Sequence, residues 1–330
     1  MTIEERKDHS REAIEMKIQY DPSLLDEVVL REIRQREDKG DFRPLKAYHA
    51  FVDPIYEQKL LPSAREAEFE KVHRKFFIDF GFEKMIVDSL LQFPELEAIE
   101  EVFVKKAMRD REEWADLGLS QKRIGIRIRQ VHFEDTQDLL RYLRHEFRHV
   151  ADMVDESFGH PRGEEGFPAG SSPSEIALLR DRYNTIWDIY VDGRLSRQGK
   201  ETIVDQEGHF RLLEAFYRGV PLLQLSAAFE ALWGVERLTH AEILEMAKDP
   251  GKVLERGETG WQSQGKQRSA FFPGSLCPLC RFPTFHWADD LDKLPKEALE
   301  SLKKDFPTWE YEEGACNRCI ETYRVEAGTW

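Results

Sequence analysis

The sequence predicts a mainly α-helical protein of the α+β class, in which a helical domain with a small sheet precedes a small zinc-binding module. Apolar residues recur at helical spacing in many segments, one short segment alternates as a strand does, and all four cysteines lie in two close pairs. We divide the chain into a helical N-terminal region (1–120), a metal-binding core (121–255), a linker (256–275) and a cysteine module (276–330).

The N-terminal region is expected to be helical throughout. Apolar residues recur every three or four positions in four segments, and prolines separate these segments from one another. The four expected helices lie within residues 23–33, 66–77, 82–91 and 95–108.

The next residues predict a strand followed by a long helix. Residues 124–129 alternate between Ile and either Gly or Arg, which is the period of a half-buried strand. Asp135 or Thr136 can then cap a helix with an apolar stripe that extends to about Val154.

Further helices are expected on both sides of the linker. A capping box at Ser172–Glu175 begins a helix that should reach about Arg197, and a helical block over 210–248 contains a second box at Thr239–Glu242. Residues 296–304 predict a short helix between the two cysteine pairs.

Composition and charge limit the classes of function. The formal net charge of −15 argues against a nucleic-acid partner, because phosphate contacts need Lys and Arg. No apolar run of about 18 residues occurs, so we expect no membrane-spanning segment. The charged N-terminus lacks the apolar stretch of a secretory signal, and the cysteines are too few for a disulfide scaffold, so we expect a cytoplasmic protein. The sequence specifies no oligomeric state.

The long helix carries the motif His145-Glu146-Phe147-Arg148-His149. His residues at positions i and i+4 lie one turn apart on the same helix face, so both imidazoles can bind one metal ion. Glu146 can take a proton from a water that such an ion activates. The motif therefore predicts a catalytic type of zinc site, with a third protein ligand and one open position.

The strand, the helix and the motif, within residues 124–194, resemble the zincin metallopeptidases. The resemblance implies a zincin-like core in which an edge strand runs beside the active-site helix. It also implies that Glu146 acts as general base, and then as proton donor, in the zinc-dependent hydrolysis of a peptide or protein substrate.

Four residues are candidates for the third zinc ligand. Asp188 and Asp192 lie one turn apart among apolar neighbours, where a carboxylate is costly to bury unless it is paired or bound to metal. Their segment, 184–193, resembles the second helix of gluzincins, which implies Asp188 as ligand and Asp192 as its supporting hydrogen-bond acceptor, or the reverse. His160 resembles the third His of SprT-like proteases and is the reserve candidate. Asp155 has the third-ligand spacing of metzincins, although a straight helix would carry it away.

The two C-x-x-C pairs predict a second metal site of a different kind. Two such pairs can close a tetrahedral zinc site with four cysteine ligands, which stabilises a fold and leaves no position for catalysis. The pattern resembles zinc-ribbon and treble-clef modules. Residues 277–330 contain seven Lys and Arg but eleven Asp and Glu, and this negative balance again argues against a nucleic-acid surface. The four expected ligands are Cys277, Cys280, Cys316 and Cys319.

These features predict a zinc-dependent metallohydrolase, specifically a metallopeptidase, with one catalytic and one structural zinc ion. One alternative is a non-catalytic, metal-stabilised scaffold or interaction protein, which Arg144 and Arg148 around the motif fit well. A second is a SprT-like protease that acts on nucleic-acid-bound proteins, and a third is a zinc hydrolase with a non-peptide substrate. The arginines of the strand and the motif helix can hold an acidic substrate, but we expect them to pair with the protein's own carboxylates.

Overall fold

The computed structural model describes residues 16–118, 120, 122–161, 173–217, 220–257, 274–284, 286–289 and 291–326. The chain divides into two compact units, Met1–Glu156 and Ser157–Trp330. Helices dominate both units and the sheets are small, which confirms the predicted fold class. The predicted division at residues 120, 255 and 275 stays a prediction. In the described part of the chain, no helix combines the length and the apolar character that a membrane span requires.

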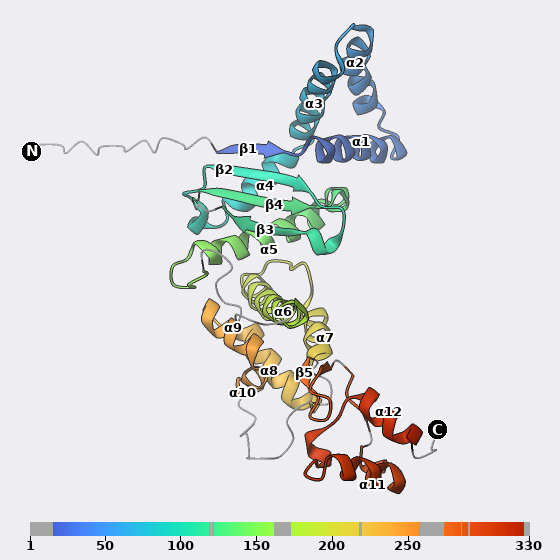
Figure 1. Cartoon of the computed structure of the whole chain (residues 1–330). Coiled ribbons are helices and arrows are strands. Elements are labelled where there is room, and N and C mark those ends of the chain that lie inside the picture. The colour runs from blue at the N-terminus through green and yellow to red at the C-terminus, as the bar shows by residue number, and fades with distance from the viewer. Residues whose placement is uncertain are drawn as a thin grey trace, which may run out of the picture. The chain divides into compact units, whose positions relative to one another are not determined.

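The first unit is built on a mixed four-stranded sheet with the order β1-β2-β4-β3 (Figure 1). β1 and β4 run parallel to β2, whereas β3 runs antiparallel to β4. Alternate residues of the inner strands are fully buried, as a half-buried strand requires. The strands are β1 (Lys17–Tyr20), β2 (Glu101–Lys106), β3 (Trp114–Leu117) and β4 (Arg123–Ile128).

The described residues of the first unit also form five α-helices. They are α1 (Pro22–Asp38), α2 (Arg43–Glu57), α3 (Pro62–Asp79), α4 (Phe82–Leu90) and α5 (Thr136–Val154). The short 3-10 turns η1 (Pro94–Leu96), η2 (Asp110–Glu112) and η3 (Gln130–Glu134) connect these elements. Three of the helices have a proline in their first turn, where its missing N–H costs no hydrogen bond. The bounds of α1, α3, α4 and α5 confirm the helices that the sequence predicted within 23–33, 66–77 and 82–91 and the long helix of the motif.

The prediction of a helix over residues 95–108 is wrong. A 3-10 turn and β2 occupy this segment, and β1 and β3 also lie where only helices were expected. Leu96, Ile99 and Val102 have helical spacing, but the β-branched pair Val102 and Val104 also fits a strand, and pairing with two neighbouring strands decides the outcome.

The strand predicted at 124–129 is confirmed as β4, but it does not lie at an edge. β4 is paired on both sides, and its neighbour β3 is one of the two edge strands of the sheet. Because α5 contacts β3, an edge strand does lie beside the motif helix, although it is not the strand that the sequence indicated.

The second unit begins with a bundle of helices. α6 contacts α7, α8 and α9, and α8 contacts α6, α7 and α10. A Cβ atom added at Gly193 of α6 would lie 2.3 Å from the carbonyl oxygen of Trp233, so the approach of α6 to α8 requires glycine. The helices are α6 (Pro173–Arg197), α7 (Gln206–Phe216), α8 (Leu222–Gly234), α9 (His240–Lys248) and α10 (Gly251–Glu255). The capping box at Thr239 and Glu242 is confirmed, whereas Ser172 of the other box lies outside the described residues.

The cysteine module forms the rest of the second unit and has its own small core. Leu279, Leu302, Trp309 and Ile320 are buried in it beside two of the cysteines. Its elements are β5 (Ser275–Leu276), β6 (Pro283–Thr284), η4 (Leu291–Lys293), α11 (Lys296–Asp305), η5 (Tyr311–Glu313) and α12 (Asn317–Glu326). α11 confirms the helix predicted at 296–304, and most of the predicted linker lies outside the described residues.

Candidate metal centres

Two groups of side chains could hold a metal ion within the described residues. The first group consists of the four cysteines, and the second is built on the paired imidazoles of His145 and His149. The four sulfur atoms of the first group lie within 4.8 Å of one another.

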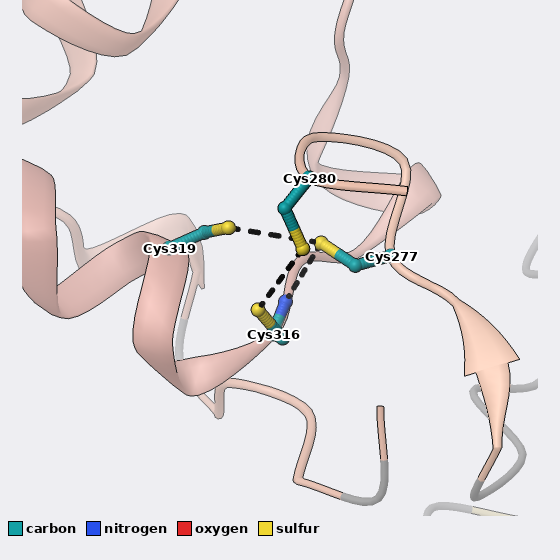
Figure 2. Close-up of side chains that lie close together, drawn as sticks. All are labelled: Cys277, Cys280, Cys316 and Cys319. Carbon is teal, nitrogen blue, oxygen red and sulfur yellow. Dashed lines mark hydrogen bonds between the residues drawn. The ribbon is translucent and has the colours of Figure 1, made fainter. Parts of the chain in front are cut away.

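The four cysteines come from two kinds of local structure, and their sulfur atoms point toward one another (Figure 2). Cys277 directly follows β5, and a tight turn, in which the Arg281 N–H donates to the Cys277 carbonyl at 2.8 Å, brings Cys280 beside it. Cys316 directly precedes α12, and Cys319 lies in the first turn of that helix. A hairpin turn and a helix N-terminus thus supply one pair each.

The distances between the sulfur atoms fit a zinc ion. The Sγ atoms of Cys277 and Cys319 are 4.0 Å apart, and those of Cys280 and Cys316 are 3.9 Å apart. A tetrahedral zinc site with Zn–S bonds of about 2.3 Å has edges of about 3.8 Å. A disulfide would need a sulfur–sulfur distance of about 2.05 Å, and all four thiols are free.

The thiols differ in how readily they ionise. Burial opposes ionisation of Cys277, but backbone N–H groups, including that of Cys316 at 3.3 Å, lower the pKa of its thiol. Burial and the neighbouring sulfur atoms raise the pKa of Cys319. Four thiolates this close repel one another unless a cation lies among them, so the cluster suits a dication that draws off the protons.

The motif helix directs both of its His residues to one point. His145 and His149 are buried, and their Nε2 atoms lie 3.2 Å apart. Two adjacent ligands of a tetrahedral zinc ion with Zn–N bonds of about 2.0–2.1 Å are separated by about 3.3–3.4 Å. The pair therefore fits zinc, although 3.2 Å is also the length of a long hydrogen bond between two neutral imidazoles. Glu146, the predicted base, is buried on the same helix.

Two arginines of the motif helix pair with the protein's own carboxylates, as the sequence analysis expected. Arg148 donates to Glu95 and to Asp152 at 3.1 Å each. Arg141 lies 3.6 Å from Asp138, one turn earlier on α5. These guanidinium groups pair with the protein's own carboxylates, so they do not compete with a cation for the site.

Asp188 and Asp192 both lie on α6, as predicted, and Asp192 has a partner that the sequence did not reveal. The Oδ2 atom of Asp192 lies 2.7 Å from Nε2 of His209 on α7, and both side chains are almost completely buried. Sequence reasoning missed His209 because no local pattern joins residues that tertiary packing brings together from different helices.

His160, the reserve ligand, lies in an aromatic cluster. Its ring stacks on Trp187 at 5.6 Å and lies 5.5 Å from His240. The hydroxyl of Tyr183 is 2.8 Å from Nδ1 of His240, and burial lowers the pKa of His240 to about 4. Asp188 and His160 both belong to the second unit, so the third ligand of the imidazole pair stays a prediction.

Neither a protein-family model, nor a curated protein, nor a solved structure matches the chain. The resemblance to zincins and to zinc-ribbon or treble-clef modules therefore stays a prediction. The function has to be inferred from the site residues themselves.

Proposed function

We propose that this protein is a zinc-dependent metallohydrolase, specifically a metallopeptidase. His145, His149 and Asp188 would hold the catalytic zinc ion, and Glu146 would act as general base. The observation that carries the proposal is the distance of 3.2 Å between two buried imidazole nitrogens. Two Nε2 atoms at this separation can both donate a lone pair to one cation.

The chemistry of the proposed site follows from the side chains around that point. A bound zinc ion supplies a Lewis acid that lowers the pKa of a coordinated water to about 7. Glu146 directly follows His145 and offers a buried carboxylate as proton acceptor. Asp188 would contribute the oxygen ligand, and the Asp192–His209 pair fixes α6 one turn farther along.

The four-cysteine group has a separate role in the proposal. Four thiolate ligands leave no open coordination position, so this second zinc ion would stabilise the fold of the module. A hairpin turn for one pair and a helix N-terminus for the other favour the treble-clef form over the zinc ribbon. Because a free thiol cluster survives best in a reducing compartment, we place the protein in the cytoplasm.

The second candidate function is a non-catalytic scaffold or interaction protein. One specific observation favours it, because the distance between the two imidazoles also suits a direct hydrogen bond. In that case only the four cysteines would bind zinc, and the motif helix would be purely structural.

The test compares peptide hydrolysis and zinc content in the Glu146→Gln variant and the wild type. Loss of the base should reduce hydrolysis of a mixed fluorogenic peptide library by about 10²–10⁴-fold while zinc content stays unchanged. The control is Glu156→Gln, which changes an exposed Glu just beyond α5 and should keep full activity. Hydrolysis that survives in Glu146→Gln would refute the mechanism, and a wild type that hydrolyses no peptide would favour the scaffold.

A further inference from the structure

A cavity with no assigned role lies among α1, α2 and α3 in the first unit. Its volume is about 610 Å³, within the range of about 300–1,000 Å³ that small-molecule sites occupy. The cavity contains no residue of the proposed zinc site, so it is independent of the proposed function.

Aromatic rings form one wall of this cavity. The ring of Tyr56 lies 5.3 Å from that of Phe69, and Phe69 stacks at 6.4 Å on His73. His73 in turn stacks at 5.9 Å on Tyr48, and the Tyr48 hydroxyl lies 2.9 Å from Nε2 of His73. Burial lowers the pKa of His73, so this ring is neutral near pH 7 and belongs to the aromatic wall.

The charged groups that line the cavity are all carboxylates. They belong to Asp26, Glu66 and Glu70, and no Lys or Arg of the described residues lines it. Within the described residues, neither Glu66 nor Glu70 forms an ion pair, whereas Asp26 lies 3.4 Å from His73. The cavity therefore combines aromatic side chains with negative charge that no lining cation offsets.

The spacing of the carboxylates favours a bulky organic cation over a metal ion as the ligand of this cavity. In the described part of the chain, the groups able to hold a metal ion do not include Asp26, Glu66, Glu70 or His73. A small, hard cation needs several oxygen atoms close together, whereas a bulky organic cation spreads its charge over an aromatic surface.

We propose that this cavity binds a small organic cation of the alkylammonium class. The aromatic wall, formed by Tyr48, Tyr56 and Phe69, contacts the apolar surface around the cationic head. Glu66 and Glu70 supply the opposite charge. The two carboxylates and the rings act together, so affinity depends on the charge of the ligand and not only on its shape.

The test measures binding of two probes of the same shape to the full-length, zinc-loaded protein by titration calorimetry. Choline carries the charge, and 3,3-dimethylbutan-1-ol is its neutral isostere. We expect choline to bind at least about tenfold more tightly than the neutral probe. A Glu66→Gln/Glu70→Gln double variant should weaken choline binding by about tenfold or more, because it removes both carboxylates.

The matched control is Glu68→Gln on the same helix, because Glu68 pairs with Lys71 and does not line the cavity. It should leave the affinity for choline unchanged. The proposal is overturned if choline fails to bind at about 10 mM, if the neutral isostere binds equally well, or if the control weakens binding as much as the double variant. A short lysine peptide that binds more tightly than choline would overturn the small-molecule assignment in favour of a protein side chain.

Discussion

The two candidate metal centres differ in how much of the coordination sphere their local structure supplies. In the cysteine module, two short segments bring four sulfur atoms together, with distances of 3.9 and 4.0 Å across the cluster. On α5, a single helical turn brings only two nitrogen atoms together, 3.2 Å apart. A site closed by four ligands can only stabilise a fold, whereas a site that begins with two leaves room for a water molecule and for chemistry.

The two centres also differ in how much the surrounding fold depends on a metal ion. The cysteine module has a small core, and two of its buried residues are cysteines. α5 instead packs against β3 and α4 in a unit that has its own sheet and apolar core. We therefore expect zinc to be required for folding at the cysteines and only for activity at the imidazoles.

The largest expected effect is that of Cys316→Ser, which removes one of the four thiolates. Structural zinc contributes about 10–16 kcal/mol of apparent binding free energy in small domains, so weakening the site should unfold the module. Tyr and Trp signals of the module in NMR spectra should lose their dispersion, while peaks from α5 stay in place.

The matched control for the cysteine variant is Arg318→Gln, an exposed residue in the same C-x-x-C segment. It should leave the spectrum unchanged. A folded module in Cys316→Ser, or in the wild type after chelation of zinc, would remove the proposed difference between the two centres.

The next largest effect is expected for Gly193→Ala, next to Asp192 on α6. Its Cβ atom would lie 2.3 Å from the carbonyl oxygen of Trp233, and such overpacking costs about 1–3 kcal/mol in the free energy of unfolding. Urea unfolding followed by circular dichroism measures this change.

Gly234→Ala, at the end of α8, is the control for this substitution because an added Cβ atom there meets nothing within 4 Å. It should keep or slightly raise the stability. Equal losses in both variants would show that α6 does not depend on its close approach to α8. Zinc at the cysteines should be retained in both.

The smallest expected effect concerns His132. Its imidazole lies between two carboxylates, whereas the imidazoles of α5 lie beside each other. Its nitrogens lie 2.9 Å from Glu113 and 2.6 Å from Asp138. Burial lowers the pKa of His132, but the two carboxylates outweigh burial and raise it above 6.5. Because the folded state binds the proton more tightly, the stabilisation is complete below the ordinary pKa and is lost as pH rises through the raised value.

The measurement for His132 is the free energy of unfolding of the wild type minus that of His132→Gln, between about pH 5.5 and about pH 9. The difference should be largest at the acidic end and should decrease toward the basic end. A difference that stays constant with pH would show that His132 is neutral in the fold.

Sequence patterns predicted the parts of the molecule that local interactions determine. α5 and its cap at Asp135 follow from one amphipathic stripe, and both C-x-x-C pairs form their turns within a few residues. The i and i+4 spacing placed His145 and His149 together before any packing was known, because a helix face is a local property.

The parts that sequence patterns missed depend on pairing between distant segments. β2 was expected to be helical because its apolar residues fit both periods, and only its neighbours β1 and β4 decide between them. His209 could not be assigned to Asp192 because the contact arises from the packing of two helices. The cavity among α1, α2 and α3 was missed for the same reason.

The most direct test of the central claim is the zinc content of the purified protein, measured by inductively coupled plasma mass spectrometry. The account predicts about two zinc ions per chain, one for each group of ligands, falling to about one in His149→Ala. A single zinc ion that His149→Ala leaves in place, and that only cysteine substitutions remove, would contradict the claim that α5 carries a metal centre.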